Sequence, residues 1–369
     1  MGKLTFVQGG FAPVGGIETF AVDILSAVKA REVETELVCW DAAAGGGNPG
    51  LEKLSQSGVA VHCSSWRWGC RWGWPDKAMA HRDWKTLLEA EVLVFGKLLH
   101  VSVHRNLLPH RKRMILVTPY RPAEMWKDRK PDKEILNSFE SIVVQAQSFE
   151  DDLRRFGYEG RAVALPYLPP EAKEASAWPA TQVLQVGFLG RFVPDKNLEY
   201  LIVSFSHLRE LGVEANLHMF GDGPERDALR SLVDRMGLIG SVRFHGNQQR
   251  SDIASALDRC HLLAFSSRTE GQPLASLEAL ARGRPVLGTP VGSFPEYLSG
   301  ALGSVAPLDN PIAYATALKA LGQPLLSREM TPGDVQRAYE TRFPRWKVID
   351  EYLQTFGCSD STPKRKQAV

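Results

Sequence analysis

Two glutamates, Glu270 and Glu278, stand in the part of the chain best suited to holding an anionic ligand. The apolar run before Glu270 predicts a short buried strand, and Pro273 suits the first turn of a helix that Gly283 ends. Glu270 then lies in a strand-to-helix turn, where parallel sheets bind ligands and helix amides attract anions such as a diphosphate. Glu278 lies inside that helix, five residues after Pro273 and ~7 Å further along the axis, where its carboxylate can accept hydrogen bonds from a ribose. Two isolated glutamates are more often surface residues, so their surroundings decide.

A basic pair, Arg191 and Lys196, follows another predicted strand in the string GRFVPDKN. The guanidinium of Arg191 can donate two hydrogen bonds to phosphate oxygens, and the ammonium group of Lys196, five residues later, adds a compact positive charge. Together they suit a diphosphate leaving group. The alternative is an ordinary surface loop, where most basic residues lie.

Glycines mark two further turns after predicted strands. Gly15 and Gly16, in VGGIETF, precede a helix and can present backbone amides to an anion, although flexible linkage explains such pairs equally simply. Gly221 and Gly223, in FGDGPER, permit a tight turn before the next helix. A turn without any ligand accounts for this second string as well as a binding role does, so Asp222 receives no catalytic assignment.

The elements that position these residues alternate between strand and helix, most regularly in the second half. Short apolar strands separated by amphipathic helices predict α/β architecture with a doubly wound parallel sheet. The first half begins the same way but is interrupted by glycines and by the tryptophan-rich string at 66–74. A proline-rich stretch, 165–182, is the expected linker. We therefore expect an N-terminal domain over 1–168, a C-terminal domain over 181–335, a helix over 336–357 packing back on the N-terminal domain, and a flexible tail over 358–369.

The strings around the charged residues resemble the donor-site signatures of the large retaining glycosyltransferase family with the GT-B fold, the family 4 type, also called glycosyl transferases group 1. Its E-G-x-P string with a second glutamate matches Glu270, near the donor sugar in the family, and Glu278, which would bind the nucleotide ribose. Its G-R-x4-K string matches Gly190, Arg191 and Lys196, at the donor diphosphate. The resemblance implies two Rossmann-like domains facing a cleft.

One departure concerns a histidine that the family carries near the reacting sugar, in a string like V-T-x-H-D. This chain has VTPYRP, which puts Tyr120 at the histidine position and Arg121 at the acidic one. Tyrosine can hydrogen-bond a sugar hydroxyl but is a poor general base near neutral pH. The resemblance implies these site residues: catalytic Glu270, Arg191, Lys196 and Tyr120, and donor-binding Gly15, Gly16, Gly190, Arg191, Lys196, Gly271, Gln272, Pro273, Leu274 and Glu278.

Composition bounds the partners and the location. A formal net charge of +2 implies no strong field for nucleic acid. The five cysteines form no CxxC pair and suggest reduced thiols in the cytoplasm. The N-terminus lacks an apolar signal region and no apolar run is long enough to span a membrane. Residues 97–133, called the basic segment below, contain ten basic and three acidic residues, with interleaved apolar ones. We expect either a solvated surface or peripheral contact with the anionic inner face of a membrane.

The expected activity is transfer of a hexose, with retention, from a nucleoside diphosphate sugar to a saccharide or lipid-linked saccharide, an acceptor or carrier that the basic segment suggests is anionic. No cofactor and no metal are expected. The metal-binding D-x-D string does not occur, and His100 and His104, although spaced like a pair of metal ligands, have no cluster of further ligands near them in the sequence. A sugar-nucleotide epimerase on the same fold and a non-catalytic donor-binding subunit stay open. An NAD-dependent oxidoreductase is disfavoured, because the chain lacks the G-x-G-x-x-G string with a following acidic residue that such enzymes carry.

Overall fold

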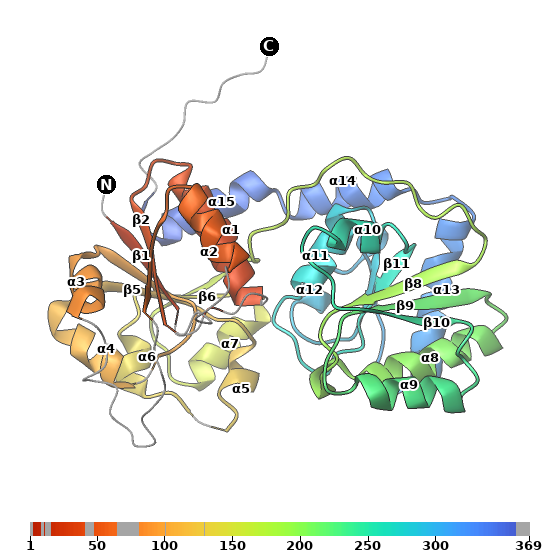
Figure 1. Cartoon of the computed structure of the whole chain (residues 1–369). Coiled ribbons are helices and arrows are strands. Elements are labelled where there is room, and N and C mark those ends of the chain that lie inside the picture. Colours follow the sequence, from red (N-terminus) through yellow and green to blue (C-terminus); the bar gives the residue numbers. More distant parts are fainter. Residues whose placement is uncertain are drawn as a thin grey trace, which may run out of the picture. The chain divides into compact units, whose positions relative to one another are not determined.

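The computed structural model describes residues 3–8, 11, 16–40, 48–64, 81–99, 101–128 and 130–358. The chain forms two compact units, each built on a parallel sheet (Figure 1). Unit 1 comprises residues 1–168 and 346–369, and unit 2 comprises 169–345. The tryptophan-rich string, Gly15 and the terminal tail lie outside the described residues.

The sheet of unit 1 has the strand order β3-β2-β1-β4-β5-β6-β7, with all neighbours parallel. Chain order reverses between β1 and β4, which makes their carboxyl ends the topological switch point of this sheet. The strands are β1 (Leu4–Gln8), β2 (Thr35–Trp40), β3 (Ala60–Ser64), β4 (Val92–Phe95), β5 (Arg113–Val117), β6 (Ser141–Val144) and β7 (Arg161–Ala164).

Helices cover both faces of this sheet, as apolar strands require. Aromatic contacts place α1 and α15 on the face that carries Phe6, and side chains of α3, α4, α6 and α7 form a buried cluster with Val7 and Phe95 on the other. The helices are α1 (Gly16–Lys29), α2 (Pro49–Gln56), α3 (His81–Glu89), α4 (Val101–Leu107), α5 (Pro122–Met125), α6 (Lys133–Asn137), α7 (Ser148–Arg155) and α15 (Arg345–Thr355), with the short η1 (Leu108–His110).

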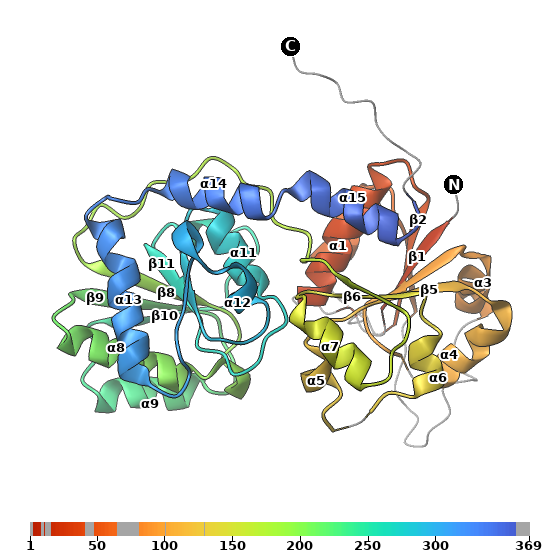
Figure 2. The same cartoon turned by 180° about the vertical axis from the view of Figure 1, so that it is seen from behind.

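The last helix, α15, completes unit 1 although it comes from the far end of the chain (Figures 1 and 2). The Tyr352 ring lies 5.3 Å from the Phe20 ring of α1, and Asp350 accepts a hydrogen bond of 2.9 Å from Arg31. The single helix expected over 336–357 is instead two helices, because Pro344 has no backbone N–H to continue the first. The first of them, α14 (Pro332–Arg342), belongs to unit 2.

The sheet of unit 2 has the order β10-β9-β8-β11-β12-β13, again parallel, with its switch point between β8 and β11. Its strands are β8 (Leu184–Leu189), β9 (Ala215–Phe220), β10 (Val242–Gly246), β11 (Leu262–Ala264), β12 (Val286–Gly288) and β13 (Gly303–Val305). Its other elements are α8 (Leu198–Glu210), α9 (Arg226–Arg235), α10 (Ile253–Leu257), α11 (Leu274–Ala281), α12 (Phe294–Tyr297), α13 (Pro311–Leu326), α14, η2 (Pro194–Lys196) and η3 (Gly300–Leu302).

A fully buried arginine, Arg284, binds the first stretch of unit 2, around Ser176 and Ala177, to the rest of that unit. Its guanidinium donates to the carbonyl oxygens of Ser176 at 2.8 Å and Ala177 at 3.0 Å, and to two carbonyls around α10. Asp258 lies 3.4 Å away as its counter-ion. Burial lowers the pKa of Arg284 to about 10, which leaves it charged near neutral pH.

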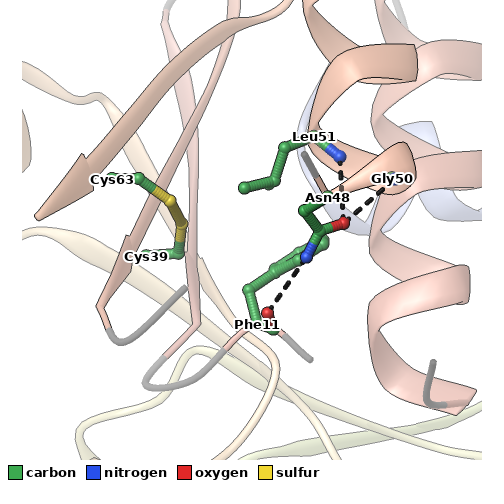
Figure 3. The surroundings of a disulfide bond; sticks show 6 residues. All are labelled: Phe11, Cys39, Asn48, Gly50, Leu51 and Cys63. Atoms are coloured by element: carbon green, nitrogen blue, oxygen red, sulfur yellow. Dashed lines mark hydrogen bonds between the residues drawn. A yellow bond between two sulfur atoms is a disulfide. The ribbon is translucent and has the colours of Figure 1, made fainter. Parts of the chain in front are cut away.

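A disulfide joins Cys39 of β2 to Cys63 of β3 (Figure 3). The two residues are in register on neighbouring parallel strands, with Cα atoms 5.0 Å apart, a spacing that disulfides adopt. For this pair the expectation of reduced thiols is wrong, because strand register brings together cysteines that lie 24 residues apart in sequence. Cys260 and Cys358 are free and buried.

Candidate functional site

Two of the four charged residues singled out in the sequence, Lys196 and Glu270, meet at the switch point of unit 2. Lys196, in the loop after β8, donates to Glu270, in the loop after β11, with 2.5 Å between Nζ and Oε1. The hydroxyl of Ser267 donates to the same carboxylate oxygen at 2.6 Å. Glu270 is 5% exposed, so its charge is met almost entirely by these two neighbours.

Polar contacts hold the two loops against each other. The Ser266 hydroxyl bridges the carbonyl oxygens of Lys196, at 2.9 Å, and Asn197, at 3.0 Å. Asn197 has a left-handed φ of 50°, a conformation that asparagine tolerates, and it joins η2 to α8. The sequence interpretation missed Ser266 and Ser267. Their signal was available: two hydroxyl residues between a buried strand and a glutamate.

The turn FGDGPER is architectural. A β-carbon at Gly221 would lie 1.8 Å from the carbonyl oxygen of Gly190, so only glycine lets these two loops approach. Asp222 accepts from the amide of Gly223 at 2.8 Å and from Arg226 at 2.7 Å. Arg191 lies beside this turn with an exposed side chain.

The second glutamate lies where the sequence placed it, inside α11 and partly buried. The helix begins at Leu274, one residue later than expected, because Pro273 keeps an extended ψ of 116° and forms the N-cap. Gly271 accepts a hydrogen bond from Ser293, and Gln272 is buried in the same turn. The neighbouring Gly292 has a φ of 61°, and a β-carbon there would lie 2.5 Å from the Gly271 carbonyl oxygen.

The remaining predicted site residues belong to unit 1. Gly16 is the first residue of α1, and Tyr120 follows β5 with 48% of its surface exposed. Arg121 donates to the buried Asp152 at 2.6 Å and lies over the Phe149 ring. Arg121 is therefore held by Asp152 and Phe149 with its side chain 39% exposed, whereas Tyr120 is exposed and can meet a ligand.

His104 is a core residue. It is fully buried between the Phe95 and Phe139 rings, and its Nε2 accepts a hydrogen bond of 3.1 Å from the Leu99 amide. Burial lowers the pKa of His104 to about 4, so it is neutral near pH 7. His100 lies outside the described residues. Among the described residues, no three His, Cys, Asp or Glu side chains gather to hold a metal ion.

The basic segment has fewer residues available to contact a membrane than its composition indicates. Contact with a membrane, one of the two alternatives for this segment, would use its apolar residues, but Leu107 and Trp126 are buried, and Leu98, Leu99, Leu108 and Met125 pack on the same core. Three of its arginines are paired with carboxylates: Arg105 with Asp132, Arg113 with Glu140 and Arg121 with Asp152. Within the described ranges, no helix has the length and apolarity to cross a bilayer.

Comparison with known proteins finds a family match within unit 2. Residues 171–323, which contain Arg191, Lys196, Glu270 and Glu278, match the glycosyl transferases group 1 family. The lipopolysaccharide core biosynthesis glycosyltransferase LpsD of Rhizobium meliloti is 28% identical over 193 residues, 51% of this chain and 53% of LpsD. The N-acetyl-alpha-D-glucosaminyl L-malate synthase of Bacillus anthracis is 32% identical over 142 residues, 38% of this chain and 36% of that enzyme.

The fold is shared over nearly the full length with a solved structure. HepE of Anabaena, crystallised in complex with UDP-glucose, has a TM-score of 0.76 at 16% identity, covering 97% of this chain and 100% of HepE. Against the curated relatives the match is shorter, since the chain spans 34% to 55% of the length of the first three. Residues 171–323 of unit 2 are therefore similar to the glycosyl transferases of group 1, and the two parallel-sheet units have the GT-B fold.

Proposed function

We propose that the chain transfers a hexose from a nucleoside diphosphate sugar to a saccharide or lipid-linked saccharide, with retention of anomeric configuration and without a metal ion. The observation that carries this proposal is the Lys196–Glu270 pair at the switch point of unit 2, with the exposed Arg191 in the same loop after β8 as Lys196. This is the part of a doubly wound sheet where ligands bind. Its cationic groups suit a diphosphate leaving group.

Donor binding would rearrange the charged pair. Lys196 is bonded to Glu270 in this structure, so an incoming diphosphate competes with the carboxylate for the ammonium group. Glu270 keeps the hydrogen bond from Ser267 during that exchange and gains capacity to accept one from a donor sugar hydroxyl. Glu278, further along α11, is the group we assign to the ribose hydroxyls.

The acceptor is assigned to unit 1, where Tyr120 can hydrogen-bond a saccharide hydroxyl. Because tyrosine is a poor base near neutral pH, we assign the acceptor proton to the departing phosphate, with attack on the same face as departure. LpsD acts in lipopolysaccharide core biosynthesis by its name, and HepE was crystallised with UDP-glucose. UDP-hexoses and saccharides are therefore the first donors and acceptors to test.

The test begins with thermal melting of the full chain in the presence of UDP-glucose, UDP-galactose or GDP-mannose. The stabilising donor is then incubated with saccharide acceptors in excess EDTA, and NMR determines the anomeric configuration of the product. A retained anomer formed in EDTA is the expected result. An inverted product contradicts retention, loss of activity in EDTA contradicts metal independence, and an epimer formed from donor alone supports the epimerase. Donor binding without transfer to any acceptor supports the binding subunit.

Location is a separate proposal: peripheral contact with an anionic membrane surface, which the exposed basic residues Lys97, Arg111, Lys127 and Lys130 favour. The Cys39–Cys63 disulfide argues against the reducing cytoplasm that the cysteine pattern suggested. Sedimentation with neutral and anionic vesicles at low salt tests the membrane contact. Equal, negligible binding to both would reject it.

A further inference from the structure

We propose that Gln8 and Gln145 of unit 1 form an acceptor-binding edge that takes the uncharged, hydroxyl-rich part of a saccharide. This inference rests on the proposed transfer reaction and assigns contacts on its acceptor side. It concerns two residues that the sequence motifs do not mark, at the carboxyl ends of β1 and β6.

Gln8 lies at the switch point of the unit 1 sheet. It is the last residue of β1, and Gly96 follows β4, the strand across which chain order reverses. Along the strand Gln8 shares a face with Phe6, which contacts α1. Its Oε1 lies 2.2 Å from the place that a β-carbon of Gly96 would take, so the absence of a side chain at Gly96 makes room for this amide.

Both glutamines are buried without satisfying their amides. Among the described residues, the Oε1 of Gln8, which is 1% exposed, has no hydrogen-bond partner, and neither Oε1 nor Nε2 of Gln145, which is 5% exposed, has one. Buried polar atoms are normally paired, and leaving one unpaired destabilises the fold. Two such groups at the ligand-binding edge of one sheet are explained if a ligand supplies the missing partners.

The chemistry of the two groups defines the ligand class. A carboxamide offers an acceptor oxygen and two N–H donors but no charge, which matches sugar hydroxyls rather than a phosphate. The two strands are three positions apart in the sheet, about 14 Å at the usual strand spacing. An acceptor that contacts both glutamines is therefore longer than one sugar unit.

The experiment compares the full chain with Gln145→Leu, Gln8→Leu and a control, Thr5→Val. Thr5 also carries a buried hydroxyl with no hydrogen-bond partner in the part of the chain that the structure describes, but it lies near the start of β1, away from the carboxyl edge. Isothermal titration measures binding of methyl α-glucoside, maltose, lactose and glucose 6-phosphate. UDP-glucose is titrated separately, and melting temperatures are recorded for every variant.

The expected result is that a neutral saccharide binds the unaltered chain and binds each leucine variant about tenfold more weakly, the effect of one lost hydrogen bond. The leucine variants should melt at an unchanged or higher temperature, because an unpaired amide is removed. Thr5→Val should leave saccharide binding unchanged, and UDP-glucose should bind all variants equally.

The inference is overturned if no neutral saccharide binds, if glucose 6-phosphate alone binds, or if Gln145→Leu keeps full saccharide affinity. A marked fall in melting temperature for Gln145→Leu would also overturn it, since that result shows a structural partner for the amide. Failure of the transfer proposal gives a different pattern: saccharide binding sensitive to the glutamines, but no binding of UDP-glucose.

Discussion

The switch points of the two sheets have the same topology, but the residues at the one in unit 2 are charged and those at the one in unit 1 are not. In unit 2 the loops after β8 and β11 bring together Lys196 and Glu270, two charges that neutralise each other. In unit 1 the strand ends at β1 and β4 bring together Gln8 and Gly96, with no charge. One backbone architecture thus supports a charged site in one unit and an amide-lined edge in the other, so the chemistry comes from the loop residues and not from the fold.

The comparison extends to how each unit is stabilised, and the largest effect is expected from the buried charge in unit 2. Arg284→Met should lower the free energy of unfolding by about 3–5 kcal/mol, because several carbonyls and Asp258 lose their cationic partner. Calorimetry of the full chain measures this. The transition of unit 2 is identified as the one that added UDP shifts to a higher temperature. Arg282→Ala, which removes a more exposed partner of Asp258, is the matched control. A loss for Arg284→Met no larger than for the control would show that the buried guanidinium is not the anchor.

Removing cations from the unit 2 switch point should abolish most of the transfer activity. Arg191→Ala and Lys196→Ala should each raise the barrier in kcat/KM by about 3–4 kcal/mol, the effect of losing a well-placed donor to developing charge. Arg226→Ala, which breaks a local pair with Asp222, should have little effect. Near-normal kcat/KM in both active-site variants would remove the charged half of the comparison.

The disulfide should matter to unit 1 alone. Closing a loop of roughly 25 residues stabilises by about 3.5 kcal/mol in the chain-entropy description. Replacing both Cys39 and Cys63 by alanine should therefore lower the melting transition of unit 1 and leave that of unit 2 in place. Cys358→Ala removes a free buried thiol of unit 1 and serves as the control. Identical unit 1 transitions in the double variant and the unaltered chain would show that the disulfide does not stabilise this unit.

The smallest effect is expected at Glu278. If its carboxylate binds ribose hydroxyls, Glu278→Ala should weaken UDP binding by about 1.5–3 kcal/mol, the range for hydrogen bonds to a charged group. Isothermal titration with UDP alone measures this, and Glu199→Ala, an exposed helix glutamate in α8, is the control. Unchanged UDP affinity would place Glu278 outside the site.

The sequence predicted unit 2 better than unit 1 for a physical reason. Glu270, Arg191 and Lys196 each stand at a strand-to-helix turn, and such turns are encoded locally by apolar runs, glycine and proline. The Cys39–Cys63 pairing depends on the register of two strands, which no local pattern records. Gln8 and Gln145 show their importance only through missing partners, and a sequence does not show which side chains are paired.

The contribution of α15 to unit 1 has a consequence for how the protein is made. Tyr352 packs on Phe20 and donates a hydrogen bond to the Pro166 carbonyl, so unit 1 needs residues that leave the ribosome after all of unit 2. In the sequence, unit 2 comes between the two parts of unit 1 and is complete by Arg345. During synthesis the middle of the chain can therefore finish folding first, while the beginning waits with one face of its sheet partly uncovered. Chains interrupted before Trp346 would expose that face and give quality-control proteases an apolar target.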